Sequence, residues 1–195
     1  MDSKFFMKVI LILIVIFAVS CSSAKGVKRI SGEAVMYGMV YNSENIPVVH
    51  AEVIVDGKTV IYTDAQGRFI LSSKQRKDFT LSLAKAGYET VTGTFRFEPM
   101  EVIHTVMVNA GELLKQAEYA MDEARYNDVI KLCDRALDLS PDRFDVSYLK
   151  ALSLIRLKEY GRARYILTEL QKNLGEREYI SRVLEGIPAV SINFP

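Results

Sequence analysis

The sequence is poor in the residues that build reactive sites. It contains no tryptophan, two cysteines and two histidines among 195 residues. The histidines, His50 and His104, are too far apart to form a short metal-binding motif, and neither HExxH nor CxxC occurs. These absences argue against zinc and redox chemistry, so we expect a protein with no catalytic residues, no metal and no cofactor.

Other fragments of catalytic motifs are incomplete. Gly57-Lys58-Thr59 resembles the end of a phosphate-binding P-loop, but Glu52 stands where its first glycine should be. A Gly-x-Ser-x-Gly elbow is missing too. His50 and Glu52 would share a strand face, where a solvated pair beside a turn is the simplest interpretation. Cys133 falls at an interior helix position, where a small apolar thiol packs well.

Charge of one sign is also lacking. Residues 1–20 carry Lys4, Lys8 and Asp2, and the rest of the chain has 23 basic and 23 acidic residues. A nucleic-acid-binding protein needs a basic face that displaces counterions from phosphates. The balanced charge therefore gives no case for nucleic acid as a partner.

The apolar run from Val9 to Val19 is too short to span a membrane. It has 11 residues, about half of the ~20 that a spanning helix needs, but it fits the core of a secretory signal. The small residues Ala18 and Ser20 lead to Cys21. This pattern resembles the lipobox of bacterial lipoproteins, with Ala18 in place of the commoner leucine and a branched Val19.

The lipobox resemblance implies a lipid-anchored protein of the cell envelope. Residues 1–20 would be a signal peptide, and residues 21–29 a short tether whose Cys21 carries diacylglycerol and an amide-linked fatty acid such as palmitate. Several chains give stable attachment, since each buried methylene contributes ~0.8 kcal/mol. Ser22 is not the aspartate that retains Gram-negative lipoproteins in the inner membrane, which favours the outer membrane. The alternatives are an ordinary signal peptide with an incidental cysteine, or an uncleaved anchor. With Cys21 acylated, Cys133 has no partner for an intramolecular disulfide.

Residues 30–109 show the pattern of short strands and tight turns. Ala51, Val53 and Val55 alternate with other residues, which is typical of a half-buried strand. Asp56-Gly57 predicts a hairpin turn, and residues 63–67 predict a second turn in which Asp64 caps the backbone and Gly67 takes a positive φ. Further strands are expected at 68–71, 79–83, 94–97 and 102–108. Such spacing predicts a β-sandwich.

Four separated segments of this region resemble the carboxypeptidase regulatory-like domain. In order they are Gly38-Met39-Val40, Ile46 to Val53, Thr63-Asp64-x-x-Gly67-x-Phe69 and Lys85-Ala86-Gly87-Tyr88. The resemblance implies a non-catalytic, seven-stranded, transthyretin-like sandwich, with His50 in place of the usual glycine. The PEGA type of envelope β-domain is a near alternative, because it shares the Asp56-Gly57 hairpin and Gly87-Tyr88.

From residue 110 the apolar period becomes helical, and it repeats. Ala117 recurs as Ala151 and Tyr126 as Tyr160, both at a spacing of 34. A 34-residue helix-turn-helix period is the signature of tetratricopeptide (TPR) repeats, and residues 110–176 resemble that family. The resemblance implies antiparallel helical hairpins that touch at the two alanines. Ala120 is smaller than usual at its position, and two repeats are fewer than the three normally needed.

The end of the helical region should be closed by a further helix at 176–185. Its inward residues are expected to be Tyr179, Ile180, Val183 and Leu184. The apolar tail, 187–195, is expected to pack on that helix or to extend a sheet edge through Ile187, Val190, Ile192 and Phe194; a docking peptide for a partner is the alternative. The fold class is thus α+β with two domains, 30–109 and 110–186. Because the junction Asn109-Ala110-Gly111 is short, few relative orientations are expected.

In the TPR family the first helix of each pair lines a concave binding face. Carried over to this sequence, the candidate partner-binding residues are Leu114, Glu118, Met121, Asp122, Tyr148, Leu152, Ile155 and Arg156. We therefore expect a non-catalytic, lipid-anchored scaffold that binds an envelope protein or peptide, unless the tail or the β-domain fills this face. The alternative is glycan binding by the β-sandwich, with Tyr37, Tyr41, Tyr62 and Tyr88 as candidate platforms.

Overall fold

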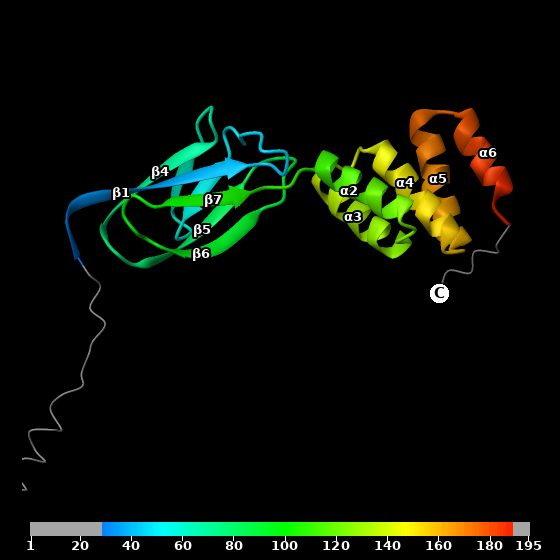
Figure 1. Cartoon of the computed structure of the whole chain (residues 1–195). Coiled ribbons are helices and arrows are strands. Elements are labelled where there is room, and N and C mark those ends of the chain that lie inside the picture. Colours follow the sequence, from blue (N-terminus) through cyan, green and yellow to red (C-terminus); the bar gives the residue numbers. More distant parts are fainter. Residues whose placement is uncertain (1–28, 189–195) are drawn as a thin grey trace, which may run out of the picture.

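The computed structural model describes residues 29–188, which form an α+β fold (Figure 1). The signal peptide, Cys21 with its lipobox, residues 22–28, and Val190, Ile192 and Phe194 of the tail lie outside the described residues. Within 29–188 there are seven strands in two sheets, followed by five helices. No helix in this range has the length and apolar character needed to cross a bilayer.

All strands precede all helices. The strands are β1 (Arg29–Tyr41), β2 (Glu52–Val55), β3 (Thr59–Tyr62), β4 (Arg68–Gln75), β5 (Asp78–Ala84), β6 (Val91–Arg96) and β7 (Val102–Val106). The helices are α2 (Ala110–Asp122), α3 (Tyr126–Leu139), α4 (Phe144–Arg156), α5 (Tyr160–Leu174) and α6 (Glu178–Gly186).

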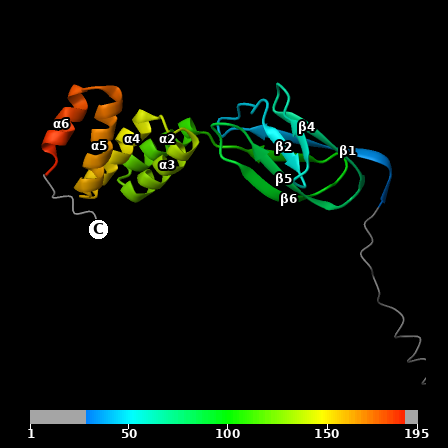
Figure 2. The ribbon, with the colours of Figure 1, turned by 180° about the vertical axis from the view of Figure 1, so that it is seen from behind.

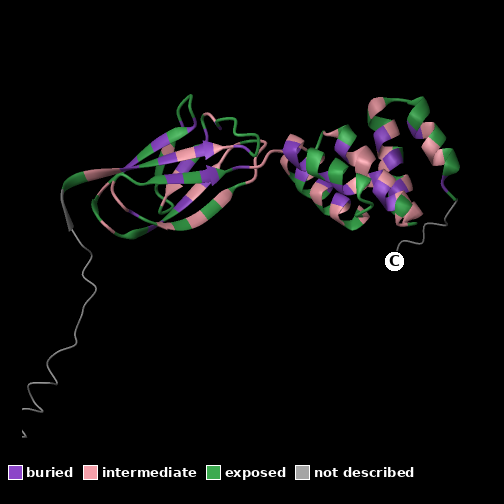
Figure 3. Ribbon diagram, in the orientation of Figure 1, coloured by how far each residue is buried: buried purple, intermediate pink, exposed green. Residues whose placement is uncertain are grey.

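The two sheets pack face to face as a sandwich. One sheet has the order β4-β1-β7 and the other β3-β2-β5-β6. Their alternate side chains meet in one core, which is visible as the buried stripes along the strands in Figure 3. That core contains Met36, Val40, Val48, Ala51, Val53, Phe69, Leu71, Phe79, Leu81, Leu83, Phe97, Ile103 and Met107.

The expected turns form as predicted. Asp56 and Gly57 both have positive φ, 51° and 67°, the combination that a type I′ turn requires, and the Lys58 N–H donates to the Val55 carbonyl oxygen at 3.0 Å. The loop between β2 and β3 has three residues, 56–58, because Val55 pairs with Thr59. Asp64 Oδ1 accepts hydrogen bonds from the backbone N–H groups of Gln66 and Arg68, each at 2.8 Å. His50 has φ 54°, a left-handed conformation that glycine adopts more easily. His50 therefore adopts a backbone conformation in this turn that favours glycine.

Gly38 allows the sandwich core to close over β1. A Cβ atom built at Gly38 would lie 1.9 Å from Cζ of Phe69, far inside any van der Waals contact. Gly38 pairs directly with Phe69 across the β1–β4 ladder. The ring thus lies over the glycine, which explains why these two residue types occur at paired positions.

The chain enters and leaves the sandwich at opposite ends. β1 and β7 run parallel side by side, and β7 leads into α2. The chain therefore enters the sandwich at one end and leaves toward the helices at the other (Figures 1 and 2). Ten residues of β1, from Gly32 to Tyr41, span ~30 Å at the usual rise of a strand.

The helices pack in sequence order and their connections repeat. Three residues join α2 to α3, and three join α4 to α5, so each pair is antiparallel. Ala124 and Lys158 occupy equivalent places in these turns, with φ of 57° and 64°. The following N–H groups donate to equivalent carbonyls, Arg125 to Ala120 at 2.9 Å and Glu159 to Leu154 at 2.8 Å. The 34-residue period of the sequence is thus also a period of the backbone.

Small residues lie where the helices touch. Ala117 and Ala151 are both fully buried, and α3 ends at Leu139, two residues before Pro141. Two apolar clusters form. The first includes Ala110, Leu113, Ala117, Ala120, Val129, Cys133, Ala136 and Val146. The second includes Ala151, Leu154, Ala163, Leu167, Leu170, Ile180 and Ile187.

One expectation about the last helix was wrong. Ile180 is fully buried and Val183 and Leu184 pack against the second cluster, but the side chain of Tyr179 is 49% exposed. Because α6 begins at Glu178, Tyr179 lies in its first turn at the margin of the cluster. Its ring stands edge-on to Tyr148, at 5.3 Å between centroids.

Candidate functional site

A groove of about 410 Å³ lies between helices α2, α4 and α6. It is lined by Met121, Leu152, Ile155, Arg156, Val183, Gly186 and Ile187, and we call these seven residues the helical groove. Four of the eight residues predicted to bind a partner belong to it. Its walls are apolar except for the guanidinium group of Arg156.

The helical period explains how α4 serves both the core and the groove. Leu152, Ile155 and Arg156 share one face, because residues three and four positions apart are neighbours on a helix. Ala151 and Leu154, on the adjoining face, are fully buried in the second cluster. One surface of α4 therefore packs in the core and the adjoining surface lines the groove. Ile155 contributes to both, because it also packs against the second cluster.

The other four predicted residues do not line the groove. Leu114 packs against the first apolar cluster, and Tyr148 packs against the second. Burial raises the pKa of the Tyr148 hydroxyl, and the neighbouring Tyr179 adds to the shift. Glu118 and Asp122 are exposed on α2. The predicted face is thus partly core, partly groove and partly solvated surface.

The contribution of α6 to the groove was missed. Val183 was expected only to pack inward and Gly186 was not considered. The signal was present, because Leu152 and Gly186 are 34 residues apart, as are Leu149 and Val183. Continuing the repeat by one more step would have placed α6 beside α4 on the same face.

The chain leaves the groove at a fixed point. Ile187 is 5% exposed and packs in the second cluster, as expected for the start of the tail. Arg164 Nη2 donates to the carbonyl oxygens of Leu184 and Ile187, at 3.3 and 2.8 Å. These bonds hold the end of α6 against α5. Pro188, the next residue, is exposed.

Arg156 gives the groove its charge. Its side chain is exposed at the rim, and none of the ion pairs within residues 32–188 involves it. The groove lining contains no carboxylate. A ligand that combines apolar side chains with a negative group would match this arrangement.

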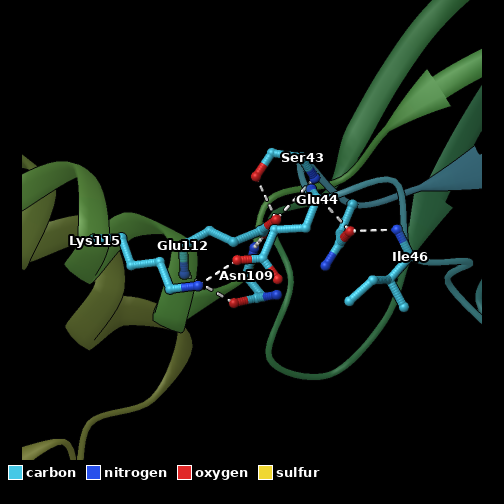
Figure 4. A network of polar contacts seen from close by, with 7 residues as sticks. Ser43, Glu44, Ile46, Asn109, Glu112 and Lys115 are labelled. Carbon is cyan, nitrogen blue, oxygen red and sulfur yellow. Dashed lines mark hydrogen bonds and ion pairs between the residues drawn. The ribbon is translucent and has the colours of Figure 1, made fainter.

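The junction between strands and helices is held by a buried carboxylate. Glu112 is 5% exposed and completes a capping box at the start of α2. Its Oε2 accepts a hydrogen bond from the Asn109 N–H at 2.8 Å. In return, Asn109 Oδ1 accepts a hydrogen bond from the Glu112 N–H at 3.0 Å. The other carboxylate oxygen of Glu112 accepts from the N–H of Ser43 at 2.8 Å and also from the Ser43 hydroxyl. Figure 4 shows Glu112 lying between the helix start and the loop after β1. A single side chain therefore caps α2 and ties it to the sandwich.

Two ion pairs reinforce this junction. Lys115 on α2 pairs with Glu44 of the same loop. Arg135 of α3 donates two hydrogen bonds of 2.7 Å to Glu89, one to each carboxylate oxygen. Arg135 thereby lowers the pKa of Glu89. Because the contacts come from two helices and two loops, they restrict the rotation of the helices relative to the sandwich.

The chemical groups outside the groove are isolated. No cluster of three or more metal-ligating side chains occurs among the described residues. Cys133 is buried, and burial raises its pKa to about 12. His104 is exposed on β7. A hollow of about 520 Å³ opens between the edge strands β3 and β4, but none of the predicted site residues lines it.

The candidate glycan platforms do not assemble into one surface. Tyr37 and Tyr62 are exposed, at 37% and 57%, but they lie on different sheets. Tyr41 and Tyr88 are half-buried. Tyr62 shares a hollow of about 440 Å³ with His50, Glu52, Ala84, Lys85, Ala86 and Thr90.

No protein-family model matches the chain, and no curated protein matches it. Among solved structures, the Bacillus anthracis TIE protein shares 14% identity over 40% of this chain and 17% of its own, with a TM-score of 0.36. 3-Chlorocatechol 1,2-dioxygenase from Rhodococcus opacus 1CP shares 15% identity over 42% of this chain and 62% of its own, with a TM-score of 0.34. The chain thus spans less than two thirds of either protein, and such low similarity supports no conclusion about fold or activity.

Proposed function

We propose that this protein is a non-catalytic, lipid-anchored scaffold of the cell envelope whose helical groove binds an apolar segment of another envelope protein. The observation that carries the proposal is the groove itself. Met121, Leu152, Ile155 and Arg156, chosen from the 34-residue period, lie around one hollow. In this proposal α2–α5 are two TPR hairpins, α6 is their cap, and the sandwich is a carboxypeptidase regulatory-like domain.

The arrangement of the sandwich supports a role as a spacer. Its N-terminal end leads toward Cys21, and its opposite end carries the helices. An acylated Cys21 would hold one end at the membrane, and ~30 Å of strand would lie between it and the junction. The buried Glu112 and the Glu89–Arg135 pair restrict rotation at that junction. The groove would therefore lie at a defined distance from the membrane, which a flexible linker would not provide.

The size of the groove implies weak binding. Full burial of an apolar side chain contributes ~1.5–3 kcal/mol, so three of them give ~5–9 kcal/mol before the cost of ordering the peptide. A micromolar complex needs about 8 kcal/mol. The proposed complex is therefore transient, and covalent capture suits it better than affinity purification.

Site-specific photo-crosslinking in cells tests the scaffold proposal. A photoreactive residue at position 155, in the groove, should give a discrete adduct with an envelope protein. The same residue at position 165 should not, because Tyr165 is 59% exposed on α5 and lies outside the groove. The adduct should disappear in a Leu152→Asp chain and persist in a Tyr119→Asp chain, where an exposed residue of α2 is changed. Identical adducts at 155 and 165, or none at 155 even in a chain that ends at Pro188, would refute the proposal.

The lipid anchor has its own test. Mass spectrometry of the protein from membranes should find a triacylated Cys21 at the amino terminus. Residues 1–20 still attached, or an unmodified thiol at position 21, would contradict it.

A second candidate function is glycan binding by the hollow around Tyr62. The exposed Tyr62 ring lies beside a carboxylate and an amine, since Glu52 and Lys85 line the same hollow. An aromatic face with polar neighbours suits a sugar ring. A glycan array probed with the wild type and with Tyr62→Ala tests this alternative. Signals that are absent or unchanged by the substitution would remove it.

A further inference from the structure

We infer that residues 189–195 bind in the helical groove of their own chain, as an extended segment. A partner must displace that segment, so its competitive role rests on the proposed function, whereas the binding itself does not. The segment is Ala-Val-Ser-Ile-Asn-Phe-Pro. Three features of the described residues carry the inference.

The first feature is where the segment starts. Ile187 is itself part of the groove lining, and a hydrogen bond from Arg164 holds its carbonyl oxygen in place. Only Pro188 separates it from residue 189. The segment therefore begins at the rim of the groove, so little chain entropy is lost in bringing it there.

The second feature is the direction of the backbone. Ile187 has φ −88° and ψ 130°, which is an extended conformation, and a residue before proline is restricted to this region. Pro188 cannot continue α6 because it lacks the N–H group. Seven extended residues reach ~23 Å. Neighbouring packed helices lie ~8–10 Å apart, so this length suffices to pass from α6 over α4 to α2.

The third feature is the pattern of side chains. Val190, Ile192 and Phe194 alternate with Ala189, Ser191 and Asn193. In an extended chain, alternate residues point to the same side. One side of the segment is therefore branched and aromatic, and it matches the apolar groove wall formed by Met121, Leu152, Ile155 and Val183. The other side carries a methyl group, a hydroxyl and an amide.

An occupant on the same chain has a large advantage over a free ligand. Short flexible connections give effective concentrations in the millimolar range. A segment whose intrinsic dissociation constant is tens of micromolar would then weaken a competing ligand by ~10–100-fold. The groove is thus closed to weak ligands and open to a partner that binds it better than residues 189–195 do.

Peptide binding to the full chain tests the inference. The probe is a fluorescein-labelled synthetic peptide of residues 187–195, measured by anisotropy against the full-length protein in detergent. A variant ending at Pro188 and the variant Ile192→Asp should each bind the probe at least ~10-fold more tightly than the wild type. The matched control Asn193→Asp, on the other side of the segment, should bind like the wild type. Equal binding by the wild type and the shortened variant, or no binding by either, would overturn the inference.

Crosslink mapping gives an independent readout that needs no partner. A photoreactive residue at position 192 of the full chain should form an intramolecular crosslink to Met121, Leu152 or Ile155. Crosslinks elsewhere on the chain, or to a second copy, would overturn the inference. Circular dichroism of each variant should remain that of the wild type.

The two proposals fail in different ways. Groove crosslinks from position 192, together with no envelope adduct at position 155 even in the shortened variant, would leave this inference standing and refute the scaffold. The opposite result is also distinguishable. If position 192 crosslinks outside the groove, and the shortened variant does not increase the envelope adduct at position 155, this inference is refuted and the scaffold proposal stands.

Discussion

The sandwich and the helices bury apolar side chains in contrasting ways. The sandwich has a single core whose members extend from Met36 to Met107. The helical part has two, one between Ala110 and Val146 and the other between Ala151 and Ile187. A core built from distant strands forms only when all the strands are in place, whereas locally built helical layers can open one at a time. We therefore expect the sandwich to unfold as a unit and the helices to open from the groove end.

The largest effect should come from emptying the second helical cluster. Leu154 is fully buried, and replacing a buried leucine by alanine costs ~2–5 kcal/mol through lost burial and the remaining cavity. In Leu154→Ala, hydrogen exchange should accelerate in α4, α5 and α6 while the strands keep their protection. Tyr165→Ala, at an exposed position of α5, should change the free energy of unfolding by less than ~0.5 kcal/mol. Equal loss of protection in strands and helices would show that the helices do not open independently of the sandwich.

Overpacking the sandwich should have a somewhat smaller but more widespread effect. The Cβ atom of Gly38→Ala would collide with the Phe69 ring, and such overpacking costs ~1–3 kcal/mol. Exchange should accelerate across all the strands together. Gly161→Ala is the control, because a Cβ there meets nothing within 4 Å, and alanine favours the helix by up to ~1 kcal/mol. Protection lost in only one sheet would show that the sandwich is not a single unit.

Glu112→Gln should uncouple the two parts. Glutamine offers one acceptor oxygen where Glu112 uses two, so either Ser43 or Asn109 would face an amide NH₂. Leaving a buried donor unpaired costs ~1–3 kcal/mol. Thermal unfolding of the helices should shift downward while that of the strands stays unchanged. Glu118→Gln, exposed on the same helix, should be close to neutral; a shared shift of both transitions would contradict the expectation.

Acid should weaken the junction only slightly. Hydrogen bonds from Arg135 lower the pKa of Glu89 from its usual 4.5, so the pair stabilises the fold fully above that value. The stabilisation is lost as the pH falls through the lowered pKa of the folded protein. Because both side chains are partly exposed, the effect should not exceed ~1 kcal/mol. Urea unfolding at pH 6 should separate the wild type from Glu89→Gln, and the difference should shrink as the pH is lowered below 4.5. A difference that stays constant would exclude this pair as the cause.

Local signals in the sequence predicted much of this fold. The Asp56-Gly57 hairpin and the Asp64 cap follow from the conformations that these residues prefer. The buried alanines 117 and 151 follow from the repeat. Each of these features depends on residues close together in the chain, which a single sequence displays directly.

The features that were missed depend on distant residues. Asn109 and Glu112 have the spacing of a capping box, but nothing in the sequence indicates that Ser43 also donates to Glu112. The parallel pairing of β1 with β7 and the ion pair between Glu89 and Arg135 also join residues that lie far apart in the sequence. The 34-residue period predicted which residues of α2 and α4 line the groove. It was not extended to α6, which was expected only to cap the helical region. Tyr179 was wrongly expected to point inward. It lies in the first turn of α6, at the margin of the second cluster, and the sequence does not show at which residue that helix begins.

The parallel β1–β7 pair has a mechanical consequence. Tension between the N-terminal end of β1 and the helices would pull these neighbouring strands in opposite directions along their length. The five residue pairs from Tyr37–Val102 to Tyr41–Val106 would then bear the force in shear and have to give way together, whereas an unzipping geometry would break them singly. The sandwich should therefore resist stretching between its two ends far better than peeling at an edge.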